Sequence, residues 1–261
     1  MKKEHPDIVL NKFGVKVLIR NTASYATFVN ESVNLEFMLM FILFAEHNDK
    51  GKLKEQLSEI YKEGNPNIVS EKLETFFKSK ESDVIFDINS YELYFGQMAY
   101  CRLVDNALCY FKDVLSEVVV KEPRVLKSTK EKENYDFILS FETIDELKKA
   151  LSDKKIKELF YGNIEDIKKF FLNRLGVKLF DNEKDEKDFS MVIKQRNLIV
   201  HNRGVITQEL ADEFSVFREM VGQELMFKYD RLSIINGLIN NLIIEIDIKL
   251  REKFDLKTFD V

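Results

Sequence analysis

Apolar residues recur at three- and four-residue steps in two long stretches of the chain, which is the spacing of helices that bury one face. The first stretch runs from about Ser90 to Val120, and Pro123 marks its end. Its apolar face comprises Leu93, Tyr100, Val104, Leu108, Phe111, Leu115 and Val118. The face of the last stretch comprises Leu232, Ile235, Ile239, Leu242, Ile246 and Leu250. We therefore predict an all-α bundle in which two long helices frame shorter ones.

Cap-forming residues indicate where the shorter helices begin and end. Thr143 and Glu146 form a capping box that opens one helix, and Gly176 lies just past the end of another. A third helix is expected to start near Asp188, after the charged loop "FDNEKDEKD". Thr207 is placed to cap the helix that follows. These signals predict several short helices between the two long ones.

Residues 1–88 are predicted to form a helical N-terminal region ahead of a helical domain at residues 89–261. Residues 7–19, "DIVLNKFGVKVLI", are ambiguous between strands and helix. Helices are expected at residues 22–47, 51–62 and 70–80.

The most apolar run is "FMLMFILFA", residues 37–45. It is much shorter than the roughly 20 residues of a membrane span. We interpret it as the buried part of a core helix that packs against the C-terminal domain and not against lipid. The first ten residues, "MKKEHPDIVL", lack the apolar core of a signal peptide.

Composition narrows the possible functions. The formal net charge of −5 argues against a broad surface that coats nucleic-acid phosphates, although it leaves room for a small basic cleft. Cys101 and Cys109 fall in one predicted helix, about 12 Å apart along its axis, which is too far for a disulfide. Two reduced cysteines suit a cytoplasmic protein. Since no Cys and His cluster has zinc-site spacing, we expect no structural metal.

The segment "QRNLIVHNRG", residues 195–204, holds the strongest candidate chemistry. Projected as a helix at 100° per residue, one arc contains Phe189, Val192, Ile193, Ile199 and Val200. Arg196 falls inside that apolar arc, and Asn197 and His201 lie one turn apart on its flank. Arg196 and His201 are about 140° apart around the axis. They can act on one phosphate only if the arginine bends across or a second subunit contributes.

A guanidinium on an apolar face needs an anionic partner, because an unpaired buried charge is costly. The partner could be an internal carboxylate, a subunit interface or a phosphate. Gly204 suits the C′ position, directly after the C-cap residue, which would place His201 in the last turn. The alternative interpretation is an ordinary capped helix end with solvated polar residues.

The run "RNLIVHN", from Arg196 to Asn202, resembles the motif of the HEPN family of helical bundle proteins, named for nucleotide binding in higher eukaryotes and prokaryotes. It matches the family's arginine, polar residue, three spacers and histidine. The long helices before and after the motif support the resemblance, which covers about residues 90–253. The first 88 residues are not explained by it.

The resemblance implies a metal-independent endoribonuclease, of the kind found among toxins and abortive-infection effectors. Such proteins work as homodimers whose two motifs face each other. Arg196 and His201 would be catalytic, and Asn197 would orient them. Histidine can shuttle a proton near neutral pH, and arginine can hold a phosphate in a bidentate grip. The 2′-hydroxyl of RNA would be the nucleophile, so no cofactor or metal is expected.

Further residues are weaker candidates. Arg203 and Asn202 could contact the substrate, and Asp105 could orient Arg196 from the long helix or be a surface charge near Arg102. Lys194 is interpreted as a surface lysine, and His5 and His47 as exposed. The expected partners are RNA and a second copy of the chain, with no membrane. An antitoxin or regulatory protein is a further candidate partner. The main rival is a HEPN dimerisation module that binds a protein or nucleotide without cleaving.

Overall fold

Helices form most of the chain in a computed structural model that describes residues 5–10, 16–36, 38, 88–127, 133–161 and 164–260. The all-α prediction is confirmed. One helix occupies residues 23–36. The others are α3 (Ile88–Lys121), α4 (Tyr135–Leu139), α5 (Ile144–Tyr161), α6 (Ile164–Phe170), α7 (Glu183–Asn202), α8 (Gln208–Glu213) and α9 (Tyr229–Phe254), with a 3₁₀ turn at Pro123–Leu126, a π-helical turn at Phe171–Leu175 and a 3₁₀ turn at Ser215–Met220.

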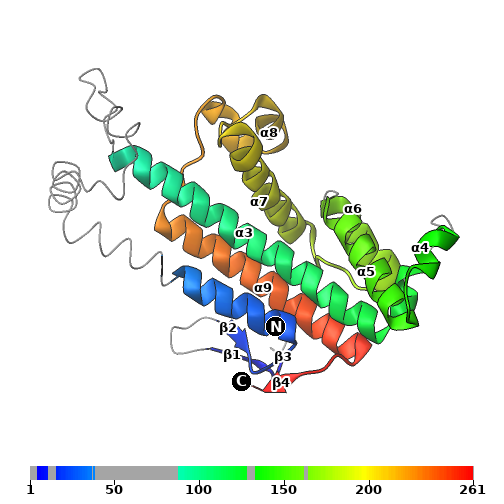
Figure 1. Cartoon of the computed structure of the whole chain (residues 1–261). Helices are drawn as coiled ribbons and strands as arrows, with labels where there is room; N and C mark the ends of the chain where they lie inside the picture. The colour runs from blue at the N-terminus through cyan, green and yellow to red at the C-terminus, as the bar shows by residue number, and fades with distance from the viewer. Residues whose placement is uncertain are drawn as a thin grey trace, which may run out of the picture.

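The two long helices predicted from the apolar spacing are α3 and α9, which lie side by side and run in the same direction (Figure 1). At one end the Gln97 side chain donates to the Leu225 carbonyl at 2.9 Å, and at the other Lys121 Nζ lies 2.9 Å from the Asp255 carbonyl. The whole predicted face of α9 is buried. In α3 the predicted face is buried except for Leu93 and Leu108, which are partly exposed. Among the described helices, none is both long and apolar enough to span a membrane.

Capping residues mark the starts and ends of the shorter helices largely where the sequence predicted them. The Thr207 hydroxyl accepts from the Leu210 amide at 3.3 Å and so opens α8. The Thr143 hydroxyl accepts from the Glu146 amide at 3.2 Å at the start of α5. Gly176 follows the π-helical turn with a φ of 60°, a left-handed conformation that favours glycine. Helix α5 packs on α3 toward its C-terminal end, and α7 packs on its N-terminal half (Figure 1).

The ambiguous segment at residues 7–19 forms strands. β1 (Ile8–Leu10) pairs antiparallel with β2 (Lys16–Leu18), and Ile8 lies opposite Leu18. β3 (Arg20–Asn21) pairs with β4 (Phe259–Asp260), which brings the two ends of the chain together (Figure 1). These short pairings lie at the edge of the helical core.

The helix at 23–36 joins the same hydrophobic core as α3 and α9, through the buried side chains of Tyr25, Phe28 and Leu35. The predicted helices at 51–62 and 70–80, and the apolar run at 37–45 except for residue 38, lie outside the described residues. The division into regions 1–88 and 89–261 therefore stays a prediction.

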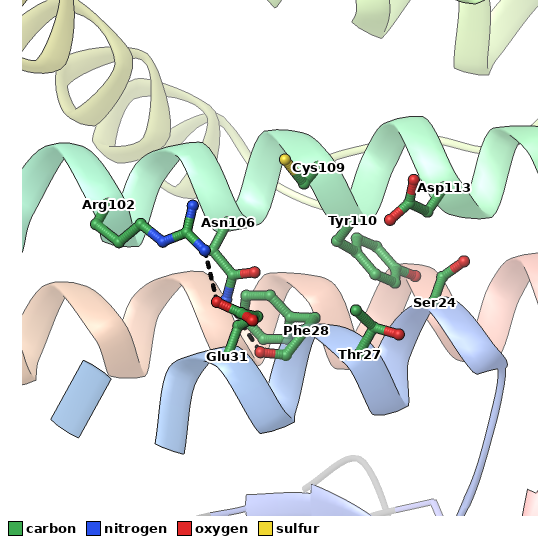
Figure 2. A pocket seen from close by; sticks show the side chains of 9 residues that line it. All are labelled: Ser24, Thr27, Phe28, Glu31, Arg102, Asn106, Cys109, Tyr110 and Asp113. Carbon is green, nitrogen blue, oxygen red and sulfur yellow. Dashed lines mark hydrogen bonds and ion pairs between the residues drawn. The ribbon is translucent and has the colours of Figure 1, made fainter. Parts of the chain in front are cut away.

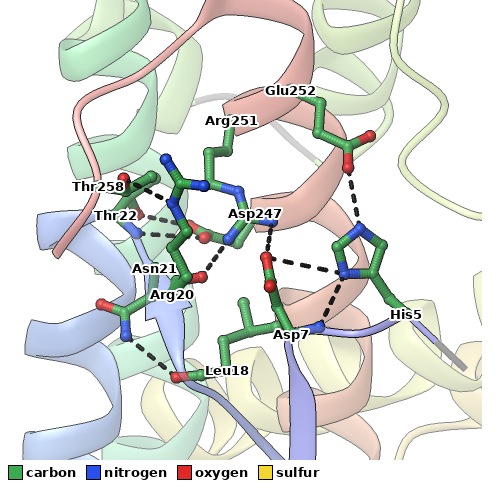
Figure 3. A network of polar contacts seen from close by, with 10 residues as sticks. All are labelled: His5, Asp7, Leu18, Arg20, Asn21, Thr22, Asp247, Arg251, Glu252 and Thr258. Atoms are coloured by element: carbon green, nitrogen blue, oxygen red, sulfur yellow. Dashed lines mark hydrogen bonds and ion pairs between the residues drawn. The ribbon is translucent and has the colours of Figure 1, made fainter. Parts of the chain in front are cut away.

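A polar network anchors the N-terminal segment to α9 (Figure 3). Asp247 is fully buried and accepts hydrogen bonds from the Thr22 hydroxyl at 2.5 Å and the Tyr110 hydroxyl at 3.2 Å. Burial raises the pKa of Asp247, and the hydrogen bonds from Thr22 oppose that shift. Beside it, Arg251 Nη2 lies 2.6 Å from Asp7. The network couples the strands and α9 through groups that are widely separated in sequence.

The interpretation of His5 as exposed is wrong. Its Nε2 lies 2.9 Å from Glu252, and its Nδ1 accepts from the Asp7 amide at 3.3 Å (Figure 3). The side chain is only 28% exposed. The cause is a tertiary contact between residue 5 and α9, which the local polar sequence did not indicate. His47 lies outside the described residues.

Candidate functional site

Helix α7 carries the "RNLIVHN" motif, and it begins earlier than predicted. The Asn182 side chain accepts from the Asp185 amide at 2.9 Å, so the first helical residue is Glu183 and not one near Asp188. Glu183, Asp185 and Glu186, which were predicted to belong to a loop, lie in the first turn of the helix. Carboxylates are favourable there because the N-terminal end of a helix carries a partial positive charge.

A buried hydrogen-bonded pair sets the rotation of α7 against α3. The Tyr100 hydroxyl lies 2.8 Å from Gln195 Oε1 and 3.0 Å from the Val192 carbonyl. Gln195 is only 1% exposed, whereas Val200 is 50% exposed. The predicted apolar arc is therefore wrong at one edge, because it included Val200 and left out Gln195. The Tyr100 hydroxyl satisfies the amide oxygen of Gln195 in this core position, whereas Gln195 Nε2 has no partner among the described residues.

Arg196 finds its anionic partner inside the chain. Its Nε and Nη2 both lie 2.9 Å from Oδ1 of Asp105 on α3. Its Nη1 also donates to Asn197 Oδ1 at 3.3 Å. Of the three partners that the sequence left open, the structure provides the internal carboxylate. The side chain is 24% exposed, and N–H groups on Nη1 and Nη2 remain without a partner among the described residues.

His201 lies in the last turn of α7 and is exposed. Its imidazole makes no hydrogen bond or ion pair with any residue that the structure describes. Because α7 is helical from Glu183 to Asn202, His201 is displaced from Arg196 by about 140° around the axis and about 7.5 Å along it. Arg196 therefore points toward α3, whereas His201 points away from it.

The end of α7 is as predicted, with His201 in the last turn and Gly204 at the C′ position. Arg203 is the C-cap residue, with a left-handed φ of 53°. Gly204 follows with a φ of 75°, and its amide donates to the Leu198 carbonyl at 3.0 Å. The Asn202 side chain donates to the Val205 carbonyl at 2.8 Å. Two consecutive left-handed residues thus reverse the chain directly after the histidine.

Gln97 of α3 packs against this reversal. A Cβ added to Gly204 would lie 2.4 Å from Gln97 Nε2, so only glycine fits here without movement of that side chain. Three contacts follow one another along α3. They join Gln97 to Gly204, Tyr100 to Gln195, and Asp105 to Arg196. Antiparallel packing of α3 and α7 therefore positions the motif.

The sequence pointed to Asp105 as a candidate but not to Gln97 or Gln195. A signal was present for Gln195, since it directly precedes the motif and adjoins the apolar arc. Tyr100 was predicted as a core residue only. Its role as a hydrogen-bond partner needs the register between α3 and α7, which one sequence does not give.

Two features bear on metal and thiol chemistry. Within the described ranges, no group of three or more His, Cys, Asp and Glu side chains could hold a metal ion. Cys101 and Cys109 are both free thiols, as predicted. Burial raises the pKa of Cys101, nearby Asp105 raises it further, and Arg196 lowers it. A raised pKa makes this thiol a poor nucleophile.

A small cavity of about 190 Å³ lies between the helix at 23–36 and α3 (Figure 2). Phe28 and Tyr110 form its aromatic wall, and the Glu31–Arg102 ion pair, at 2.5 Å, lies at one side. Burial raises the pKa of Asp113 at the other side. The sequence did not indicate this cavity, because its residues meet only when the two helices pack together.

The arrangement on α7 offers a fixed cation and an exposed imidazole on neighbouring turns. An arginine held by a carboxylate can present its remaining N–H groups to a phosphate oxygen. An unpaired imidazole can accept or deliver a proton. Comparisons of the chain with protein-family models, with curated proteins and with solved structures found no match.

Proposed function

We propose that the protein is a metal-independent endoribonuclease of the HEPN type. The observation that carries the proposal is the contrast on α7 between Arg196, which Asp105 orients, and His201, which is exposed without a partner. The match of "RNLIVHN" to the family motif supports the same assignment.

The proposed reaction needs only protein side chains and the RNA itself. The 2′-hydroxyl attacks the adjacent phosphorus, the bond to the 5′-oxygen breaks, and the products are a 2′,3′-cyclic phosphate and a 5′-hydroxyl. His201 transfers the proton. Arg196 stabilises the charge that develops on the phosphate oxygens. Asn197 holds the guanidinium, and Asn202 and Arg203 are proposed to contact the substrate backbone.

The active form is proposed to be a homodimer. Since Arg196 and His201 diverge around one helix, a single chain does not present both to one phosphate. Two copies related by a two-fold axis would place Arg196 of one chain beside His201 of the other.

An exposed apolar stripe supports such an interface. Tyr94, Met98, Cys101 and Asp105 follow at four- and three-residue steps on one face of α3. Tyr94 is 61% exposed and Met98 is 67% exposed, and the half-exposed Val200 lies on α7. Because Asp105 contacts Arg196, this stripe adjoins the proposed site. An apolar stripe beside an incomplete site favours coverage by a second copy.

The test is cleavage of labelled RNA in the presence of EDTA. The wild type should cleave and leave 2′,3′-cyclic phosphate ends, whereas His201→Ala should lose about 10² to 10⁴ in rate. Arg196→Ala should lose on the order of 10² to 10³, and Arg196→Lys should also be poor because lysine lacks the planar fork. Arg124→Ala is the matched control, since the Arg124 side chain is 85% exposed and, among the described residues, bonds only to Glu122, just past the C-terminal end of α3.

Unfolding curves of every variant separate catalytic from structural loss. Wild-type cleavage by both alanine variants, or cleavage that needs Mg²⁺, would refute the mechanism. We propose that the protein is a toxin or defence effector that acts on cytoplasmic RNA. An antitoxin or regulatory protein would hold it inactive.

A second candidate function is a non-catalytic HEPN module that binds a protein or a nucleotide. The net charge of −5 favours it, because RNA would be repelled outside the immediate site. The Arg196–Asp105 pair is also compatible with a structural role. A wild type that cleaves no RNA but binds a partner through α7 would replace the first proposal with this one.

A further inference from the structure

A groove of about 400 Å³ runs between the first half of α7 and the first half of α9. On the α9 side, Ile234, Gly237, Leu238, Asn241 and Glu245 follow at helical spacing and so share one face. On the α7 side, Asp181, Lys184, Asp185 and Asp188 line it. These residues precede Arg196 by eight residues or more, which is at least about 12 Å along the chain's helical axis, and the facing wall is α9 and not α3. The groove is therefore separate from the proposed RNA site.

The floor of the groove is apolar and incompletely covered. Phe180 and Leu242 are buried beneath it, and Leu238 is partly buried. Ile234 is 70% exposed. Apart from the glycine's own helix, no atom of the described residues lies within 4 Å of the point that a Cβ at Gly237 would occupy, so the helix surface there is open. Open apolar surface of this kind marks contact sites for other molecules.

Carboxylates outnumber cations along the rim. Asp181 is already paired with Lys249 at 2.6 Å, and Asp185 accepts from Asn182 at 2.6 Å. Asp188 and Glu245 make no hydrogen bond or ion pair with any described residue, and Lys184 is the single cation lining the groove. The unpaired rim charge is negative, which favours a cationic occupant.

From this combination we infer that the groove docks a basic amphipathic helix of another protein. Its apolar side chains would cover Ile234 and fill the open space over Gly237. Its lysines or arginines would lie against Asp188 and Glu245. Helices commonly bind in this way, with apolar anchors in a groove and charges at the margins that set specificity. The inference concerns a different surface from the proposed ribonuclease site and does not depend on it.

The test uses a fluorescein-labelled synthetic helix of leucine and lysine, with the leucines on one face, and a twin in which glutamate replaces every lysine. Fluorescence anisotropy should show binding of the lysine peptide only. Gly237→Phe should abolish binding by filling the groove, whereas Gly237→Ala should retain it. Both substitutions remove a helical glycine from the same position, so they differ mainly in bulk.

Charge reversal supplies the second arm of the experiment. Asp188→Lys combined with Glu245→Lys should weaken the lysine peptide by about twofold to fivefold per charge and favour the glutamate peptide. Asp145→Lys combined with Glu209→Lys, which reverses two exposed carboxylates outside the groove, should change neither affinity beyond a uniform small loss.

The inference would be overturned if the two double variants weakened binding of the lysine peptide equally. It would also be overturned if Gly237→Phe left that binding intact. Sedimentation showing that Gly237→Phe dissociates a dimer would overturn it too, since the occupant would then be a second copy of the chain.

Discussion

At the residue scale, a single contact decides how Arg196 can be used. The Arg196–Asp105 pair is partly exposed, at 24% and 38%, so it adds little to the stability of the fold. Its main consequence is orientation, because one carboxylate oxygen fixes the Nε–Nη2 edge of the planar guanidinium and leaves one N–H group on each of Nη1 and Nη2 available.

Asp105→Asn should therefore reduce RNA cleavage more than it reduces stability. We expect the free energy of unfolding to fall by no more than about 1 kcal/mol, as for other exposed ion pairs. The cleavage rate should lie between those of the wild type and Arg196→Ala. Urea unfolding and EDTA-treated cleavage assays measure both quantities. A variant with wild-type cleavage would show that Asp105 does not position the arginine.

Asp247 gives a prediction about pH. Burial raises its pKa in the folded protein above the ordinary aspartate value, so the folded state binds the proton more tightly than the unfolded state does. Its contribution to stability is therefore greatest below the ordinary pKa and is lost as pH rises through the raised value. Asp247→Asn should lack that decline, as urea unfolding over a pH series would reveal. The same slope in variant and wild type would contradict this.

At the element scale, α7 shows how a helix is specified by its ends and its contacts. Asn182 caps it, Arg203 and Gly204 end it, and Gln97 and Tyr100 of α3 fix its position. The exposed face between these points carries His201. The geometry of the motif thus depends on residues outside it.

Two glycines in contrasting surroundings test this account of the helix ends. Gly204→Ala should destabilise the fold by about 1–3 kcal/mol, because the residue is left-handed and its Cβ would collide with Gln97. Gly237→Ala should instead stabilise it by about 0.5–1 kcal/mol, because its surroundings are open and alanine favours a helix. Chemical denaturation of the two variants should give opposite signs. Equal effects would show that the packing at Gly204 is not restrictive.

The sequence predicted some elements of the structure better than others. The stripe of α9 was confirmed throughout, because apolar spacing reports burial directly. The start of α7 was missed because a charged helix turn and a charged loop have similar composition. The burial of Gln195, the pairing of Arg196 with Asp105 and the place of His5 depend on contacts across long sequence separations. Those contacts arise from tertiary packing and leave no local pattern.

At the scale of the whole molecule, the central claim concerns two chains. One chain holds Arg196 against α3 and turns His201 outward, so the proposed active site is complete only when a second copy supplies the other residue. The apolar stripe with Tyr94 and Met98 beside Asp105 is the surface expected to bring the copies together.

Mixing two inactive variants tests that claim most directly. Arg196→Ala and His201→Ala are unfolded together, refolded and assayed for RNA cleavage with EDTA. A heterodimer would hold one site that lacks both residues and one intact site. Since about half of the dimers are mixed and each has one intact site, about a quarter of wild-type activity should return. If the wild type cleaves RNA and the mixture stays as inactive as either variant alone, the shared site is contradicted.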